Sequence, residues 1–204
     1  MDEKQIQILE KVRQLTVETG LTYLSIDEVA KKLDLSKEEI LSVAGTEEEL
    51  VEKALDYERD CFKEIFDNND FEKTNAIDIL LIVSKEMSKR FFDITPSVTF
   101  NLKKHYPQIY HKHVEKRIEF IFDKIKVNLQ KGVSQGMYRQ DLSIELVARL
   151  YISRLIDLHN PDFFPPDQFS FETLFDVMFD NFIRGIANPT GMDYYEQKKK
   201  LFSL

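Results

Sequence analysis

Apolar residues recur with the spacing of an α-helix along nearly the whole chain. In residues 4–19 they fall on one stripe of a helix, and Gly20 is placed to end that helix. The same period continues in five later stretches, which proline and glycine segments separate: residues 76–92, 95–104, 110–135, 143–159 and 169–187. No stretch alternates between apolar and polar residues as a strand would. The sequence therefore predicts an all-α protein.

Three capping signals lie close together near the N-terminus. Ser25 to Glu28, Ser36 to Glu39 and Thr46 to Glu49 each match the capping box, in which a hydroxyl and a carboxylate satisfy backbone N–H groups at a helix start. Only Asp34 and Leu35 remain to join the first of these helices to the second, and Gly45 stops the second after about two turns. A helix, a tight turn and a short helix, braced by the preceding one, form the outline of a helix-turn-helix module.

The chain resembles the TetR family of bacterial repressors in this head and beyond it. The head resemblance is carried by residues 25–37 (SIDEVAKKLDLSK) and by Thr46 to Leu50. Turns and helix ends similar to those of the family's body occur at residues 105–107, 132–142 and 182–187. The resemblance implies a three-helix helix-turn-helix head in residues 1–46, a connecting helix in 47–66 and a helical-bundle ligand-binding and dimerisation body in 67–204. It also implies a homodimer that represses transcription by binding double-stranded operator DNA with two heads. A small molecule bound in the body would release the dimer from the DNA.

The DNA-binding residues expected from the head are Ser25, Lys32, Ser36, Lys37, Glu38, Leu41, Ser42 and Thr46. The sequence departs from the family here, because Leu41 and Glu47 stand where the family has a tyrosine and a lysine that touch phosphates. Residues 1–60 hold eight Lys or Arg against sixteen Asp or Glu, which accounts for the whole net charge of −8. Phosphate binding draws affinity from cations. The alternative is a small-molecule-binding or interaction protein on the same scaffold, with weakened or lost DNA binding.

Two C-terminal helices are apolar over much of their circumference, unlike a surface helix with one apolar stripe. With the family resemblance, this predicts a four-helix dimer interface that includes Leu146, Leu150, Phe175, Met178, Phe179 and Phe182. The alternative is that both helices are simply buried within one chain.

Aromatic residues are frequent in the middle of the chain, among sixteen phenylalanines and eight tyrosines overall. Such rings can fill a core. In the resembled family the same region encloses the effector, so a small apolar or aromatic ligand and a pocket with these candidate residues are expected: Phe91, Phe100, Asn101, His105, Tyr110, Phe120 and Tyr151.

Other classes of function lack support in the sequence. There is no phosphate-binding glycine loop, nucleophile elbow or metalloprotease helix motif, so we expect neither an enzyme nor a cofactor. His111 and His113 point about 200° apart on a helix, which argues against a metal site, and together with His105 and nearby lysines they suggest a solvated basic face. No stretch approaches a membrane span and the first residues are polar, so a cytoplasmic protein is expected.

Overall fold

The structure is a computed structural model that describes residues 2–19, 25–91, 96–158, 160, 162–165 and 167–202, with only the backbone described for residues 17, 88, 90, 91, 96–100, 201 and 202. The regular elements among these residues are all α-helices, which confirms the all-α class. The helices are α1 (Glu3–Thr19), α2 (Ile26–Leu33), α3 (Lys37–Val43), α4 (Glu47–Asp67), α5 (Ala76–Phe91), α6 (Pro96–His105), α7 (Pro107–Ser134), α8 (Ile144–Asp157), α9 (Phe171–Ile186) and α10 (Pro189–Phe202). Within this part of the chain, no helix is both long and apolar enough to cross a membrane.

The chain divides into two compact units. The first comprises Met1–Glu64 and Asp93–Arg117, and the second Ile65–Phe92 and Ile118–Leu204. The first unit contains the expected head and nearly all of the expected connecting helix. It also takes in residues 93–117, a stretch that the sequence analysis assigned to the body.

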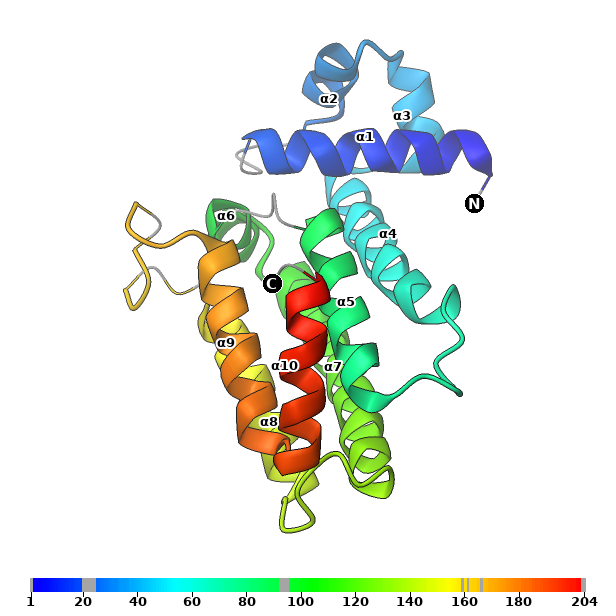
Figure 1. Cartoon of the computed structure of the whole chain (residues 1–204). Coiled ribbons are helices and arrows are strands. Elements are labelled where there is room, and N and C mark those ends of the chain that lie inside the picture. The colour runs from blue at the N-terminus through cyan, green and yellow to red at the C-terminus, as the bar shows by residue number, and fades with distance from the viewer. Residues whose placement is uncertain are drawn as a thin grey trace. The chain divides into compact units, whose positions relative to one another are not determined.

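In the first unit, α1 passes across both α2 and α3 (Figure 1). The apolar stripe of α1 supplies Leu9 to a core whose centre also includes Ile40 of α3 and Leu50 of α4, all fully buried. Leu102 of α6 is buried in the same core. The structure therefore confirms the expected three-helix head.

The three predicted helix starts carry the expected caps. Ser25 Oγ accepts from the N–H of Glu28 at 3.2 Å. Ser36 and Glu39 form the full reciprocal box, at 3.1 Å and 2.9 Å. Thr46 Oγ1 accepts from the N–H of Glu49 at 3.1 Å, but the Glu49 carboxylate turns back to the N–H of Gly45 at 2.8 Å, one residue earlier than expected.

The turn between α2 and α3 depends on one residue in the left-handed conformation. Asp34 has φ 53°, which Asp tolerates better than most side chains, and its N–H donates to the carbonyl of Ala30. Leu35 then donates to the same carbonyl at 2.9 Å. The chain thus reverses within two residues, as the short link between the two capping signals predicted.

The second unit contains a helix that the sequence analysis did not predict. α10, red in Figure 1, runs between α5 and α9. It begins with Pro189 at its first position, and the side chain of Asn188 accepts from the N–H of Gly191 at 2.9 Å. The turn after α7 reaches the same junction, where the Arg139 N–H donates to the carbonyl of Ile186 at 2.9 Å.

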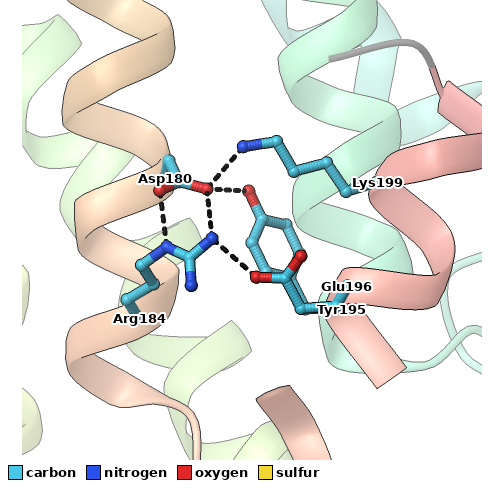
Figure 2. Close-up of polar contacts among 5 residues, drawn as sticks. All are labelled: Asp180, Arg184, Tyr195, Glu196 and Lys199. Carbon is cyan, nitrogen blue, oxygen red and sulfur yellow. Dashed lines mark hydrogen bonds and ion pairs between the residues drawn. The ribbon is translucent and has the colours of Figure 1, made fainter. Parts of the chain in front are cut away.

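Polar contacts hold α10 against both neighbours. Figure 2 shows Asp180 of α9 accepting from Arg184 at 2.6 Å, from the Tyr195 hydroxyl at 2.9 Å and from Lys199 at 2.7 Å. Arg184 also donates to Glu196 at 2.6 Å. On the other side of α10, the hydroxyl of Tyr194 donates to Asp78 of α5 at 2.6 Å. Adjacent tyrosines therefore connect α10 to two different helices.

This network predicts a specific acid sensitivity. Burial disfavours the charged form of Asp180, but its hydrogen bonds from Arg184, Lys199 and Tyr195 outweigh burial and lower its pKa to about 2. A carboxylate whose pKa is lowered in the folded state stabilises the fold above its unfolded pKa, and that stabilisation is lost as the pH falls to the folded pKa. We expect Asp180→Asn to lower the free energy of unfolding by about 2 kcal/mol at pH 6.

The measurement is urea unfolding of both proteins between pH 6 and pH 2. The difference between them should shrink from about pH 4 downward. Asp193→Asn removes an exposed carboxylate of α10, the helix that Asp180 contacts, and is the matched control, with little expected change. A difference that stays constant over this pH range would rule out the assigned role of Asp180.

Candidate functional site

Four of the DNA-binding candidates lie on the exposed face of the short helix α3. Lys37, Glu38, Leu41 and Ser42 are exposed, whereas Ile40 and Val43 are buried in the core of the first unit. Leu41 is 42% exposed, so its apolar side chain is available to a ligand.

The lysines around α3 have acidic partners. Lys37 pairs with Asp27 of α2 at 2.8 Å, Lys4 with Glu39 at 3.0 Å, and Lys53 with Glu49 at 2.7 Å. The hydrogen bond and the charge of Asp27 raise the pKa of Lys37. Such exposed pairs are weak and exchange readily for other anions. They nevertheless make the surface beside α3 less positive than its lysines alone would suggest.

The remaining DNA-binding candidates surround the same helix. Ser25, Ser36 and Thr46 use their hydroxyl oxygens as acceptors for the helix caps, and each retains a proton that it can donate. Lys32 is exposed in the last turn of α2, next to the equally exposed Lys31. The candidates from α2, α3 and the start of α4 therefore lie on elements of one compact unit.

One histidine of the expected basic face is buried instead. His113 is 6% exposed, and its Nδ1 lies 2.7 Å from a guanidinium nitrogen of Arg59 on α4. Burial, together with the charges of Arg117, Arg59 and Lys116, lowers the pKa of His113 to about 3. The neutral ring therefore accepts from Arg59, and the prediction that His113 is solvated is wrong. His105 and His111 are exposed as expected.

A metal site is not formed by the part of the chain that the structure describes. Within it, no group of three or more His, Cys, Asp or Glu side chains could hold an ion.

The candidate pocket residues are distributed over both units. In the first, Tyr110 packs against the core of the head, Asn101 is half-buried and His105 is exposed. In the second, the Tyr151 ring lies 4.5 Å from that of Phe182, and the Phe120 ring meets Phe66 edge-on at 5.6 Å. The side chains of Phe91 and Phe100 lie outside the described residues. The pocket stays a prediction.

Sequence reasoning missed one polar residue in the second unit. Ser84 of α5 is 2% exposed, and its hydroxyl has no hydrogen-bond partner within the described chain. A buried unpaired hydroxyl is unfavourable by roughly 1–3 kcal/mol and calls for a partner. Its sequence signal is its place in the buried stripe formed with Ile77 and Leu81, where a serine interrupts apolar residues.

The residues assigned to the dimer interface fall into two groups. Leu146 and Leu150, one turn apart on α8, are each 60% exposed, and Val177 on α9 is 56% exposed. The four α9 residues of the interface prediction are instead buried within the chain: Phe175, Met178, Phe179 and Phe182. They pack there because α9 contacts α8 on one side and α10 on another. On α8 and α9, the large apolar side chains exposed to a partner are therefore Leu146, Leu150, Ile156 and Val177.

No family model matches the sequence, and no curated protein matches it. Solved structures do match it over nearly its whole length. CprB from S. coelicolor A3(2), a TetR family protein, is 12% identical with a TM-score of 0.71, covering 98% of this chain and 97% of CprB. A TetR transcription regulator from Haloarcula marismortui is 16% identical with a TM-score of 0.71, covering 92% of this chain and 100% of that one.

AibR, solved in complex with isovaleryl coenzyme A and operator DNA, is 18% identical with a TM-score of 0.59, covering 88% of this chain and 97% of AibR. Identities this low establish the fold. The helical head, the helical bundle and these full-length matches together show that the chain has the fold of the TetR-family transcriptional regulators.

Proposed function

We propose that this chain is a homodimeric DNA-binding repressor that a small-molecule effector releases from its operator. The observation that carries the proposal is the geometry of α2 and α3, joined by a two-residue turn, with the polar and apolar side chains of α3 exposed. In a helix-turn-helix module the second helix enters the major groove. The fold is shared with AibR, which was solved with both operator DNA and a small molecule.

Contacts to the DNA divide into two kinds. Lys31 and Lys32, with the hydroxyls of Ser25, Ser36 and Thr46, would bind phosphates and fix the position of the head. The exposed side chains of α3 would reach the base edges. Because few cations are available, each phosphate contact contributes a large part of the affinity, and the salt dependence should be shallow for a repressor.

The effector would be a small apolar or aromatic molecule bound among the candidate aromatic residues, which include Phe120 and Tyr151. Ser84 supports a binding role for the second unit, because its buried hydroxyl would gain a hydrogen bond from a ligand that carries one polar group on an apolar or aromatic body. Leu146 and Leu150, with Val177, support self-association through α8 and α9.

A second candidate function is favoured by the ion pairs around α3. If Lys37 stays paired with Asp27, and Lys4 with Glu39, these two lysines do not bind phosphates. The chain would then be an interaction or small-molecule-binding protein with weakened or lost DNA binding. Neither candidate function is that of an enzyme.

The two candidates differ in a DNA titration. We expect the chain to bind DNA from upstream of its own gene roughly 1,000-fold or more tightly than a random duplex, measured by fluorescence anisotropy from 50 to about 200 mM salt. Reversing the charges of Lys31 and Lys32 to glutamate should weaken binding to both duplexes by roughly tenfold or more at low salt.

The control is the same reversal at Lys73 and Lys200, which are exposed residues of the second unit. It should leave binding unchanged. Equal affinity for the upstream DNA and the random duplex at every salt concentration would contradict the repressor and favour the second candidate.

A further inference from the structure

We infer that Glu38 and Leu41 select the operator, by favouring a cytosine and a neighbouring thymine in each half-site. The inference rests on the proposed DNA-binding function and specifies the bases that the head would recognise.

Two of the four exposed DNA-binding candidates on α3 already have partners within the head. The ammonium of Lys37 is paired with Asp27 at 2.8 Å, and the hydroxyl of Ser42 donates to the carbonyl of Glu39 at 2.7 Å. Among the described residues, the carboxylate of Glu38 has no hydrogen bond or ion pair. Glu38 and Leu41 are therefore the exposed side chains of α3 whose ends are not engaged within the head.

The carboxylate of Glu38 restricts the bases that this side chain can contact. An ionised carboxylate only accepts hydrogen bonds, so it needs an amino group on the base edge. In the major groove guanine presents two acceptors and thymine one acceptor beside a methyl group, which leaves cytosine N4 and adenine N6 as donors. Adenine places its N7 acceptor beside N6, where it repels a carboxylate. Cytosine is therefore the preferred partner of Glu38.

Leu41 is suited to a different base from Glu38, and its distance along the helix determines which base pair it can reach. An apolar side chain in the major groove is best accommodated against the methyl group of thymine. Leu41 follows Glu38 by three residues, so both lie on the same exposed face of α3 and about 4.5 Å apart along its axis. Successive base pairs are about 3.4 Å apart. The two side chains would thus contact neighbouring base pairs.

The charge of Glu38 adds discrimination against other sequences. A carboxylate brought into the groove is repelled by the phosphates, and only an operator that offers an amino group compensates for this repulsion. Removing the charge while keeping the shape should therefore weaken selectivity and, at the same time, strengthen binding to random DNA. A residue with a merely structural role would not produce both changes.

The experiment is selection of bound sequences from a random duplex library by the full chain, followed by titration of the selected and random duplexes. For the parent chain we expect half-sites with a cytosine next to a thymine. Glu38→Gln should lower the preference for cytosine at that position roughly tenfold and shift it toward adenine, which pairs well with an amide. Its affinity for random duplex should rise a few-fold.

Leu41→Ala should reduce the thymine preference by about threefold and leave the cytosine preference intact. Glu48→Gln, which neutralises an exposed carboxylate at the start of α4, is the matched control and should select the same sequences as the parent. Because Glu38 and Leu41 are exposed, both variants should keep the parent's circular dichroism spectrum.

The outcomes separate this inference from the proposed function. If the parent enriches a sequence and both α3 variants enrich the same one, Glu38 and Leu41 do not select bases and the inference fails while DNA binding stands. If the parent enriches no sequence, the repressor and the inference fail together. The shift from cytosine toward adenine in Glu38→Gln supports both.

Discussion

The Leu150→Glu variant is expected to be a monomer that binds operator DNA roughly 100-fold or more weakly than the parent chain. Leu146 and Leu150 expose 60% of their surface on adjacent turns of α8, and water excluded from such a patch is the main source of affinity in a dimer interface. A glutamate placed there would be buried without a partner on association. In the proposed homodimer two linked heads would bind cooperatively, so loss of the dimer would reduce DNA affinity as well.

The position of Leu150 separates an effect on dimerisation from an effect on folding. Its side chain is largely outside the core of the chain, so the substitution should leave the monomer folded, whereas a charge at buried Phe179 would unfold it. Light scattering at micromolar concentration reports the mass, and the upstream-DNA titration reports the affinity. Val127→Glu is the matched control, because Val127 is also 60% exposed but lies on α7. A dimer that persists in Leu150→Glu would disprove an interface through this face of α8.

The head could be predicted from sequence because its determinants are local. A capping hydroxyl and carboxylate three residues apart mark each helix start, and the two-residue link between α2 and α3 leaves room for little but a sharp turn. The pairing of Lys37 with Asp27, ten positions away, depends on how α2 and α3 pack. Charge counts along the chain therefore indicated an acidic head but could not show which lysines have acidic partners.

The residues of α9 show why a buried face and an interface look alike in a sequence. Both consist of apolar residues at helical spacing, and Phe179 satisfies the pattern as well as Val177 does. Only the packing of α8 and α10 around α9 shows that Phe179 is covered within the chain while Val177 remains exposed. The pattern thus located the helices correctly, but it could not distinguish a face that is buried within the chain from a face that is exposed to a partner.

The helix α10 was missed because its contacts are polar. Tyr194, Tyr195 and Lys199 attach it through hydroxyl and ammonium groups to Asp78 and Asp180, so it lacks a strong apolar stripe. Its start was nonetheless recognisable, because Asn188 followed by Pro189 is a common helix beginning. Ser84 and His113 were missed for a related reason, since burial of a polar side chain depends on the surrounding helices.

Gly132→Ala is expected to lower the free energy of unfolding by about 3 kcal/mol, near the top of the usual range for an overpacked core. A Cβ atom at Gly132 of α7 would lie 2.0 Å from a ring carbon of Tyr138. The ring cannot move aside easily, because Tyr138 is fully buried and its hydroxyl donates to Asn128 at 3.0 Å. Asn128 in turn donates to the carbonyl of Ala76 at 2.8 Å, so a displaced ring would disturb the start of α5 too.

Gly185→Ala provides the matched control for Gly132→Ala. Gly185 is also a helical glycine, and a Cβ atom there meets nothing within 4 Å. Because alanine favours a helix over glycine, this control should be neutral or stabilising by up to about 1 kcal/mol. Urea unfolding of each variant at one protein concentration gives the comparison.

A double variant identifies the ring as the cause. Tyr138→Leu alone leaves a cavity and removes the donor to Asn128 Oδ1, and is itself destabilising. If Gly132 is required because the ring of Tyr138 occupies the space of a Cβ atom, then Gly132→Ala should be much less harmful once the ring has been removed. The two effects should therefore sum to more than that of the double variant, by roughly 1–3 kcal/mol. Strict additivity would place the cause in the backbone of α7 rather than in the contact between Gly132 and Tyr138.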